Sequence, residues 1–158
     1  YGPRMNPKDG RALPNFVAQS LLRQPITVYG SGEQTRSFCY VDDTVAGILA
    51  LMEHPDARGQ AVNIGNPAEV TLHELILKIQ TLVGTELPSV YSDMPQDDPV
   101  RRRPDIGKAK SLLGWEPRVG LDQGLRATIT WFEGQLLSTP PEPAPADHTR
   151  TKGHDGGR

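Results

Sequence analysis

Four short segments of the 158-residue sequence combine residue types that could bind an anionic ligand, namely residues 1–4, 27–36, 63–66 and 97–105. In the second segment, Tyr29 precedes the turn Gly30-Ser31-Gly32, where a glycine backbone can approach a ligand closely. Arg36 follows the turn, and a guanidinium group suits phosphate or carboxylate. An aromatic ring beside such a cation is what a nucleoside diphosphate requires, because the ring stacks on the base while the charge holds the phosphates.

Each of the other three segments presents a candidate side chain for binding. The first is a turn that presents Arg4. In the third, Asn63 stands near the carboxyl end of a predicted strand, which is where open α/β sheets bind ligands. In the fourth, the Arg triplet 101–103 lies between Pro99 and Pro104, which stiffen the segment and help to aim a side chain.

These candidates also have explanations that need no ligand. Tyr29 could belong to the core, and Asn63 could satisfy backbone groups at the end of its strand. Gly30 and Gly32 alone are typical of a turn, because the dinucleotide fingerprint needs a third glycine and a helix directly behind it. The Arg triplet 101–103 could be a solvated face or a short nucleic-acid patch.

Composition and charge exclude several other classes of protein. The net charge of −2 and the pI near 6.1 give no bulk attraction to nucleic acid or to an anionic membrane. No apolar run reaches the roughly 18 residues of a membrane helix, and no signal peptide is visible. The single cysteine, Cys39, cannot form an intrachain disulfide, which fits a reducing cytoplasm. The 4 histidines lack the spacing of metal ligands, so we expect no metal site.

The elements that must position these side chains alternate between helices and strands, which favours a mixed α/β domain over residues 1–137. Apolar residues three to four positions apart predict helices over residues 11–24, 42–54, 71–84, 105–114 and 121–136. Thr71 and Glu74 form a capping-box pattern at the start of the third helix. Short apolar or β-branched runs predict strands over residues 26–29, 37–41, 61–65 and 89–91.

The predicted helices carry larger apolar faces than these short strands can cover, which hints at a missing sheet. The Pro-rich residues 138–158 cannot bury enough apolar surface to offset their ordering entropy, so we expect them to be disordered.

Residues 1–137 resemble the C-terminal half of the extended short-chain dehydrogenases that act on nucleotide sugars, and most of all the UDP-glucuronate decarboxylases. The resemblance rests on motifs in this order: Y-G-P-R-M, T-V-Y-G-S-G-E-Q-T-R-S-F-C-Y-V-D-D, A-V-N-I-G-N-P, D-D-P-V-R-R-R-P-D-I-G-K-A-K and L-L-G-W-E-P. It implies an α/β fold that is the C-terminal part of an extended Rossmann-type dehydrogenase. Residues 62–65 and the helix before them would be the last Rossmann elements. The helices after Arg11, Thr71, Asp105 and Leu121 would build a small mixed α/β substrate-binding lobe.

The resemblance also implies a reaction. In these enzymes bound NAD oxidises the sugar C4 hydroxyl, CO2 leaves from the resulting β-keto acid, and NADH returns hydride to give UDP-xylose. The family's base is a Tyr-x-x-x-Lys pair, but no tyrosine here has Lys four residues later, and no Gly-rich NAD motif is present. We therefore expect that the N-terminal NAD-binding half is absent and that this chain alone is inactive. The full-length form is expected to be a cytoplasmic homodimer that acts on a UDP-sugar, with neither nucleic acid nor membrane as a partner.

By their match to the family motifs, several residues are expected to bind the nucleotide. Leu13, Asn15 and Phe16 would border the uracil and the diphosphate. Thr27 and Tyr29 would flank the uracil.

The charged positions and the rim of the cleft follow from the same match. Arg4 would lie near the NAD, Arg36 would hold phosphate, and Asn63 would sit at the rim. Arg102 would lie beside the diphosphate or the substrate carboxylate. Arg101 is the alternative candidate for this contact, because an alignment shifted by one residue within the triplet would place Arg101 at the motif position of Arg102.

Two alternatives to the decarboxylase stay open. The first is a nucleotide-sugar 4-epimerase or 4,6-dehydratase of the same superfamily, which would release no CO2. The second is a non-catalytic fragment that binds a nucleotide sugar.

Overall fold

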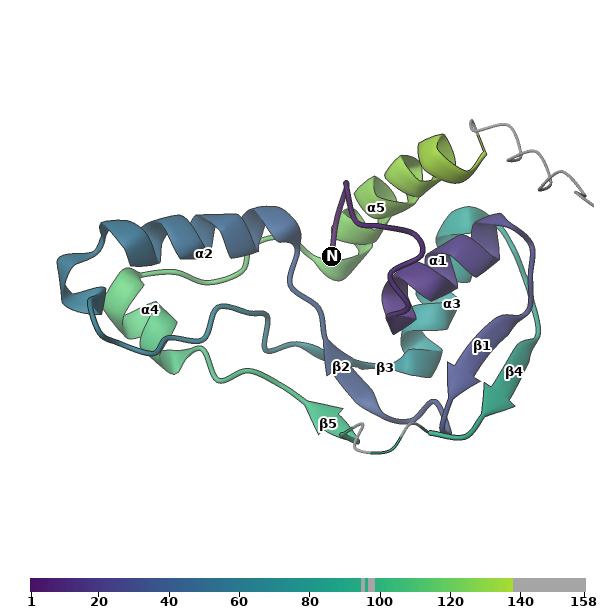
Figure 1. Ribbon diagram of the computed structural model, residues 1–158, viewed down its shortest axis with the longest axis horizontal. Coiled ribbons are helices and arrows are strands. Elements are labelled where there is room, and N and C mark those ends of the chain that lie inside the picture. The colour runs from purple at the N-terminus through teal and green to yellow at the C-terminus, as the bar shows by residue number, and fades with distance from the viewer. Residues whose placement is uncertain (95, 97–98, 138–158) are drawn as a thin grey trace, which may run out of the picture.

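The computed structural model describes residues 1–94, 96 and 99–137, and it shows two lobes side by side along the long axis of the molecule (Figure 1). Its helices are α1 (Ala12–Leu21), α2 (Val41–Glu53), the 3₁₀ helix η1 (Pro55–Ala57), α3 (Leu72–Val83), α4 (Gly107–Leu113) and α5 (Leu121–Leu136). Its strands are β1 (Ile26–Tyr29), β2 (Thr35–Ser37), β3 (Glu69–Thr71), β4 (Ser89–Ser92) and β5 (Arg101–Arg102). The predicted disorder of residues 138–158 concerns a segment outside the described residues, as do Asp97 and Asp98 of the fourth polar segment.

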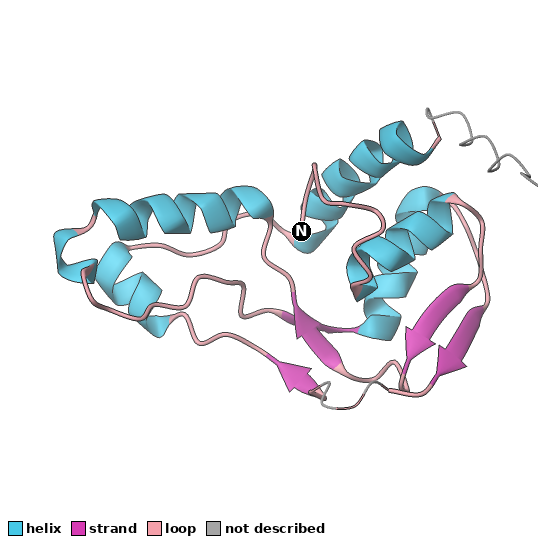
Figure 2. Ribbon diagram, in the orientation of Figure 1, coloured by secondary structure: helices cyan, strands magenta, loops and turns pink. Residues whose placement is uncertain are grey.

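The strands form two small sheets (Figure 2). In the first, β1 and β4 pair in parallel, with Ile26 opposite Ser89. In the second, β2 lies between β3 and β5, antiparallel to β3 and parallel to β5. Thr35 therefore lies opposite both Thr71 and Arg101. The mixed α/β class predicted from the sequence is confirmed, although β3 and β5 lie outside the predicted strands.

The larger hydrophobic core is centred on α1, which contacts α3, α5 and β1. Its buried side chains recur three to four residues apart on the helices, as the sequence predicts, and two residues apart on β1. They are Leu13, Phe16 and Val17 of α1, Ile26 and Val28 of β1, Leu72, Leu75, Ile76 and Ile79 of α3, and Leu125, Ile129 and Phe132 of α5. Fully burying one such side chain contributes about 1.5–3 kcal/mol, so this core is what holds the right-hand lobe of Figure 1 together.

The capping box predicted at the start of α3 is confirmed. The Glu74 N–H donates to Thr71 Oγ1 at 3.1 Å, and the Thr71 N–H donates to Glu74 Oε2 at 2.8 Å. At the other end of the helix, Gly84 adopts a left-handed conformation (φ 73°) that a side chain would disfavour. Local sequence thus fixes both ends of this helix.

A second, smaller hydrophobic cluster joins α4 to α2 and to the extended segment before β3. Trp115 lies at its centre, and its indole Nε1–H donates to the Asp43 carbonyl at 3.0 Å. Gly47 permits this packing, because a Cβ there would lie 2.6 Å from Ile64 Cγ2 and 2.9 Å from the Trp115 ring. The prediction that the helix after Asp105 helps to build the substrate-binding lobe is therefore wrong, since α4 packs with the predicted Rossmann elements.

The predicted strand over residues 61–65 is also wrong. Val62 and Ile64 do point into the smaller cluster, which explains the strand-like alternation in the sequence. The segment pairs with no other strand in the described part of the chain, and its backbone therefore forms no ladder.

Glu69 holds the three strands β3, β2 and β5 together. Its carboxylate accepts two hydrogen bonds from the Arg101 guanidinium, at 2.8 and 2.6 Å, and one from the Thr35 hydroxyl at 2.8 Å. The hydrogen bond from Arg101, followed by that from Thr35, lowers the pKa of Glu69 to about 2. The Glu69 carboxylate therefore links Thr35 and Arg101, which lie 34 and 32 positions away from it in the sequence.

Helix α2 leaves one apolar face uncovered. Val45, Ile48, Leu49 and Met52 lie on this face and are 46–76% exposed; we call them the exposed stripe of α2. We expected some helices to carry apolar faces larger than the short strands can cover, and α2 confirms this expectation. None of the helices in residues 1–94, 96 and 99–137 is long and apolar enough to span a membrane.

The Glu69 network predicts a stability that depends on pH. The pKa of Glu69 is lower in the folded chain than in the unfolded one, so its stabilising effect is fully present above about pH 5 and disappears as the pH falls towards 2. Glu69→Gln should therefore lower the free energy of unfolding at pH 7, and the difference from the original chain should shrink between pH 5 and 2. Urea denaturation across this range measures the difference, with Glu86→Gln at an exposed position as the control. Parallel pH profiles for the original chain and Glu69→Gln would contradict the assignment.

The exposed stripe of α2 predicts a change in solubility without a change in stability. Leu49 is 50% exposed, so Leu49→Lys should alter the free energy of unfolding by no more than about 0.5 kcal/mol. It should also reduce self-association, because it places a charge within an apolar patch. Urea denaturation and light scattering test the two expectations. The matched control is Leu75→Lys on α3, which should unfold the chain because Leu75 is fully buried; equal destabilisation by both changes would refute the exposure of α2.

Candidate functional site

A cavity of about 670 Å³ opens beside α1, between the N-terminal loop and the strands β1, β2 and β5. Its lining includes 7 of the 9 side chains that the sequence predicts for binding: Leu13, Asn15, Phe16, Thr27, Tyr29, Arg36 and Arg102. These residues come from four separate elements of the chain. The fold therefore gathers most of the predicted site in one place.

Strand β1 presents its two candidate residues through simple alternation. Ile26 and Val28 are buried in the core, so Thr27 and Tyr29 point to the opposite face and line the cavity. The Thr27 N–H donates to Gln19 Oε1 at 3.1 Å, and Gln19 Nε2 donates to the Thr27 hydroxyl at 3.0 Å, which fixes this threonine against α1. Tyr29 is 47% exposed, so the alternative that it belongs to the core does not hold.

Helix α1 supplies the apolar wall of the cavity. Leu13 and Phe16 are each 2% exposed and lie between the cavity and the core. Asn15 lies near the mouth, where its side-chain amide donates to the Gly10 carbonyl at 3.1 Å. The apolar wall is therefore backed by the core, and Asn15 adds a polar side chain beside it.

Strand alternation separates the three arginines of the triplet. Arg102 lines the cavity, whereas Arg101 forms its paired hydrogen bonds with Glu69, and Arg103 Nη1 lies 3.8 Å from the same carboxylate. The structure thus brings Arg102, and not Arg101, to the predicted site. Arg36 lies directly opposite Arg102 in the pairing of β2 with β5, so two guanidinium groups reach the same cavity from neighbouring strands.

The negative charge of Glu69 offsets the repulsion among the neighbouring arginines. Four arginines at positions 36 and 101–103 would repel one another on adjacent strands, because like charges directly opposite destabilise a sheet. Glu69 pairs with Arg101 and Arg103, whereas the side chains of Arg36 and Arg102 line the cavity. Arg36 also donates from Nη1 to the Thr35 carbonyl at 2.8 Å, which restrains its guanidinium.

Two predicted residues do not line the cavity. The side-chain amide of Asn63 donates to the Asp105 carbonyl at 3.0 Å, so it ties the extended segment before β3 to the start of α4. This contact corresponds to the alternative in which Asn63 satisfies a backbone group. Arg4 is exposed on the N-terminal turn and has a positive φ of 68°, which is unusual for a residue with a side chain.

Several lining residues were missed from the sequence. Gln34 is only 4% exposed, and its side-chain amide donates to the Tyr29 carbonyl across the turn between β1 and β2. Ser37 also lines the cavity, and its buried hydroxyl has no hydrogen-bond partner among the described residues. Both residues lie within the motif T-V-Y-G-S-G-E-Q-T-R-S-F-C-Y-V-D-D, which was the available signal for them. Arg11 also lines the cavity but is paired with Asp9, Nε to Oδ2 at 2.6 Å.

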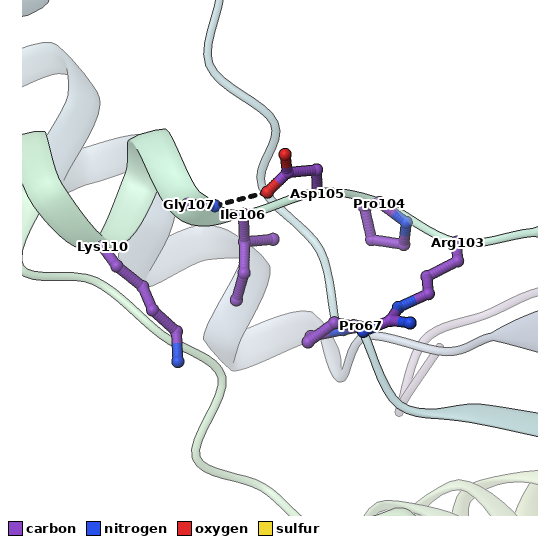
Figure 3. A pocket seen from close by; sticks show the side chains of 7 residues that line it. All are labelled: Pro67, Arg103, Pro104, Asp105, Ile106, Gly107 and Lys110. Carbon is purple, nitrogen blue, oxygen red and sulfur yellow. Dashed lines mark hydrogen bonds between the residues drawn. The ribbon is translucent and has the colours of Figure 1, made fainter.

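A second hollow, of about 370 Å³, lies where β5 leads into α4 (Figure 3). Its charged side chains are already engaged: Lys110 contacts Glu116 at 2.8 Å, and Asp105 accepts a hydrogen bond from the Gly107 N–H at 2.8 Å. Arg103 extends along its edge towards Pro67. This hollow holds none of the predicted site residues and is separate from the cavity beside α1.

The described residues do not provide a dinucleotide site. Gly30 and Gly32 have positive φ values of 77° and 84°, but the turn that they form leads into strand β2 and not into a helix. The requirement for a helix directly behind the glycines is therefore not met. No group of three or more side chains of the metal-ligating types gathers within the described part of the chain.

Known proteins resemble this chain in sequence and in fold. Residues 1–65 match the model of the NAD dependent epimerase/dehydratase family. UDP-glucuronic acid decarboxylase 2 of Arabidopsis thaliana is 45% identical over 155 residues, which cover 96% of this chain and 34% of that protein. The chain thus spans about a third of the length of the curated relatives that it matches.

Among solved structures, UDP-glucuronic acid 4-epimerase from Bacillus cereus, in complex with UDP-glucuronic acid and NAD, superposes with a TM-score of 0.80 at 30% identity and covers 85% of this chain and 43% of its own. UDP-glucose 4-epimerase from Thermotoga maritima with UDP-glucose gives a TM-score of 0.81 at 33% identity and covers 86% of this chain and 44% of its own. By these likenesses the chain is similar to the C-terminal part of proteins of the NAD dependent epimerase/dehydratase family, and residues 1–65 carry the match to the family model.

Proposed function

We propose that this chain is the nucleotide-sugar-binding part of an NAD-dependent UDP-glucuronate decarboxylase, which converts UDP-glucuronate to UDP-xylose and CO2. The observation that carries the proposal is the cavity beside α1, which combines an aromatic ring, an apolar wall and two guanidinium groups. Its volume of about 670 Å³ lies within the roughly 300–1,000 Å³ that is usual for ligand pockets. The decarboxylases among the relatives supply the choice of reaction.

In this proposal the two ends of the cavity bind two ends of the ligand. Thr27 and Tyr29 flank the uracil, and Leu13, Asn15 and Phe16 border it along α1. A base that stacks on Tyr29 covers a ring that is otherwise about half exposed.

The cationic end of the cavity would hold the diphosphate. Arg36 and Arg102 reach the cavity from paired positions on β2 and β5, so their spacing is set by the sheet. A guanidinium can form two parallel hydrogen bonds to one phosphate, which favours arginine over lysine at such a position. Arg102 is also the candidate for the substrate carboxylate.

The chemistry of the reaction would take place outside the described residues. NAD, when bound, supplies the acceptance and return of hydride at the sugar C4. Only Arg4 of this chain is proposed to lie near it, because the described residues offer no dinucleotide turn. The contribution of this chain is therefore to bind and orient the UDP-sugar.

A 4-epimerase is the second candidate. The observation that favours it is the likeness to two solved 4-epimerases, each crystallised with a UDP-sugar. The two candidates share the proposed binding cavity and differ in the product. Only the decarboxylase releases CO2 from UDP-glucuronate.

Substitution within the Arg triplet tests the proposed binding site. Arg102→Gln should weaken UDP binding by about 10- to 150-fold, because the loss of a hydrogen bond to a charged group costs roughly 1.5–3 kcal/mol. Arg126→Gln is the matched control, since it removes the same charge from an exposed position on α5 that does not line the cavity, and it should change the affinity by no more than about threefold. Isothermal titration calorimetry at constant ionic strength gives both values. No UDP binding by the original chain, or an equal loss in Arg126→Gln, would contradict the proposal.

Cofactor content and product analysis test the proposed reaction. We expect the 158-residue chain to retain no NAD through purification and to release no CO2 from UDP-glucuronate. The protein translated from the complete reading frame should release CO2 and form UDP-xylose. Absorbance of the denatured supernatant measures NAD, and chromatography of the nucleotide sugars identifies the product. Stoichiometric NAD in the short chain would contradict its predicted inactivity, and formation of the C4 epimer without CO2 would favour the epimerase.

A further inference from the structure

The turn between β1 and β2 lies at the edge of the proposed binding cavity. It is bounded by Tyr29 and Gln34, both of which line the cavity. The Gly30 N–H donates to the Ser92 carbonyl at 2.8 Å, and the Gln34 amide closes the turn onto the Tyr29 carbonyl. Strand alternation directs Tyr29 towards the cavity, and this turn restrains the end of β1 at which Tyr29 lies.

The side chain of His73 holds this turn from the side of α3. His73 Nδ1 lies 2.9 Å from Glu33 Oε1, and His73 Nε2 lies 3.1 Å from the Tyr91 hydroxyl. The rings of His73 and Tyr91 meet edge to face, with their centroids 6.2 Å apart. The residues Glu33, His73 and Tyr91, here called the His73 cluster, thus connect the turn to α3 and to β4.

Close packing of the backbone reinforces this connection. A Cβ on Gly32 would lie 2.2 Å from His73 Nε2, so only glycine allows the imidazole to rest against the turn. The main-chain N–H of His73 donates to the Gly32 carbonyl at 3.3 Å. Both the ring and the backbone of His73 therefore contact the turn that bears Tyr29.

The hydrogen bonds of the cluster are satisfied in either charge state of the imidazole. The Glu33 carboxylate can only accept, so Nδ1–H is the donor to it. In the neutral ring Nε2 accepts from the Tyr91 hydroxyl, and in the protonated ring Nε2–H donates to that oxygen.

The exposure of the cluster indicates that global stability is not its main effect. The side chain of Glu33 is 73% exposed and that of His73 is 39% exposed. Exposed pairs of this kind contribute little to the free energy of folding. Their effect is local, because they restrict a glycine turn that would otherwise have wide conformational freedom.

We propose that His73 is a positioning residue that fixes Tyr29 for contact with the nucleotide base, and this inference rests on the proposed function. Different side chains restrain the base end and the phosphate end of the cavity. The His73 cluster restrains the turn that follows β1, whereas Glu69 restrains β2 and β5, which carry Arg36 and Arg102. Loss of His73 should therefore weaken recognition of the base and leave recognition of the diphosphate intact.

Measuring the binding of UDP and of pyrophosphate to the same variants separates recognition of the base from recognition of the diphosphate. His73→Ala should weaken UDP binding by about two- to tenfold, the range expected for the loss of one hydrogen-bonded restraint, and leave pyrophosphate binding unchanged. His73→Gln, whose amide can both donate and accept, should recover part of the loss. Lys78→Ala is the matched control, because it breaks another surface contact of α3, with Asp122 at 2.8 Å, away from the turn.

Hydrogen exchange tests the restraint without a ligand. The amides of Gly32 and Glu33 should exchange faster in His73→Ala than in the original chain, and those of the α3 interior should not change. Unchanged exchange and unchanged UDP affinity in His73→Ala would overturn the inference while leaving the proposed function standing. Equal losses for UDP and pyrophosphate would also overturn it, since they would indicate general loosening of the cavity. An original chain that binds neither ligand would instead contradict the proposed function.

Discussion

The ionic contact between Glu69 and Arg101 is the interaction on which the binding face depends. Strands β2, β3 and β5 are two or three residues long, too short for backbone ladders alone to fix their register. The Glu69 carboxylate joins all three, because it lies on β3 and accepts from Thr35 of β2 and Arg101 of β5. It also offsets the repulsion that four neighbouring arginines would create. The strands that carry Arg36 and Arg102 are therefore joined through this one carboxylate.

Elements governed by local sequence were predicted well. The capping box of α3 and the alternation in β1 are fixed by neighbours within four residues, so their patterns are visible in the sequence. Strands β3 and β5 were not predicted, because their existence depends on pairing with Thr35 and Arg36, which lie 34–36 and 66 residues away, rather than on any hydrophobic pattern. The strand predicted over residues 61–65 failed for the converse reason, since its alternation serves contacts with Trp115 and not a ladder.

The residues of the candidate site also divide into those indicated by local sequence and those that depend on distant contacts. Motif resemblance indicated 7 of the residues that line the cavity, including Tyr29 and Arg36, because those residues lie within continuous segments of sequence. The choice between Arg101 and Arg102 required the strand itself, since only the pleat determines which side chain faces the cavity. The His73 cluster was not predicted, because its contacts join residues 40 and 18 positions apart, and no local pattern pairs them.

The two hydrophobic clusters differ greatly in size, and this difference bears on how cooperatively the chain unfolds. The larger cluster buries 12 side chains and the smaller one buries 3. A region with few buried contacts opens at a lower free energy than the rest of a protein. We therefore expect the lobe of α2 and α4 to open at a lower free energy than the lobe of α1 and α3. The binding cavity lies beside the larger cluster, so we expect it to persist when the smaller lobe opens.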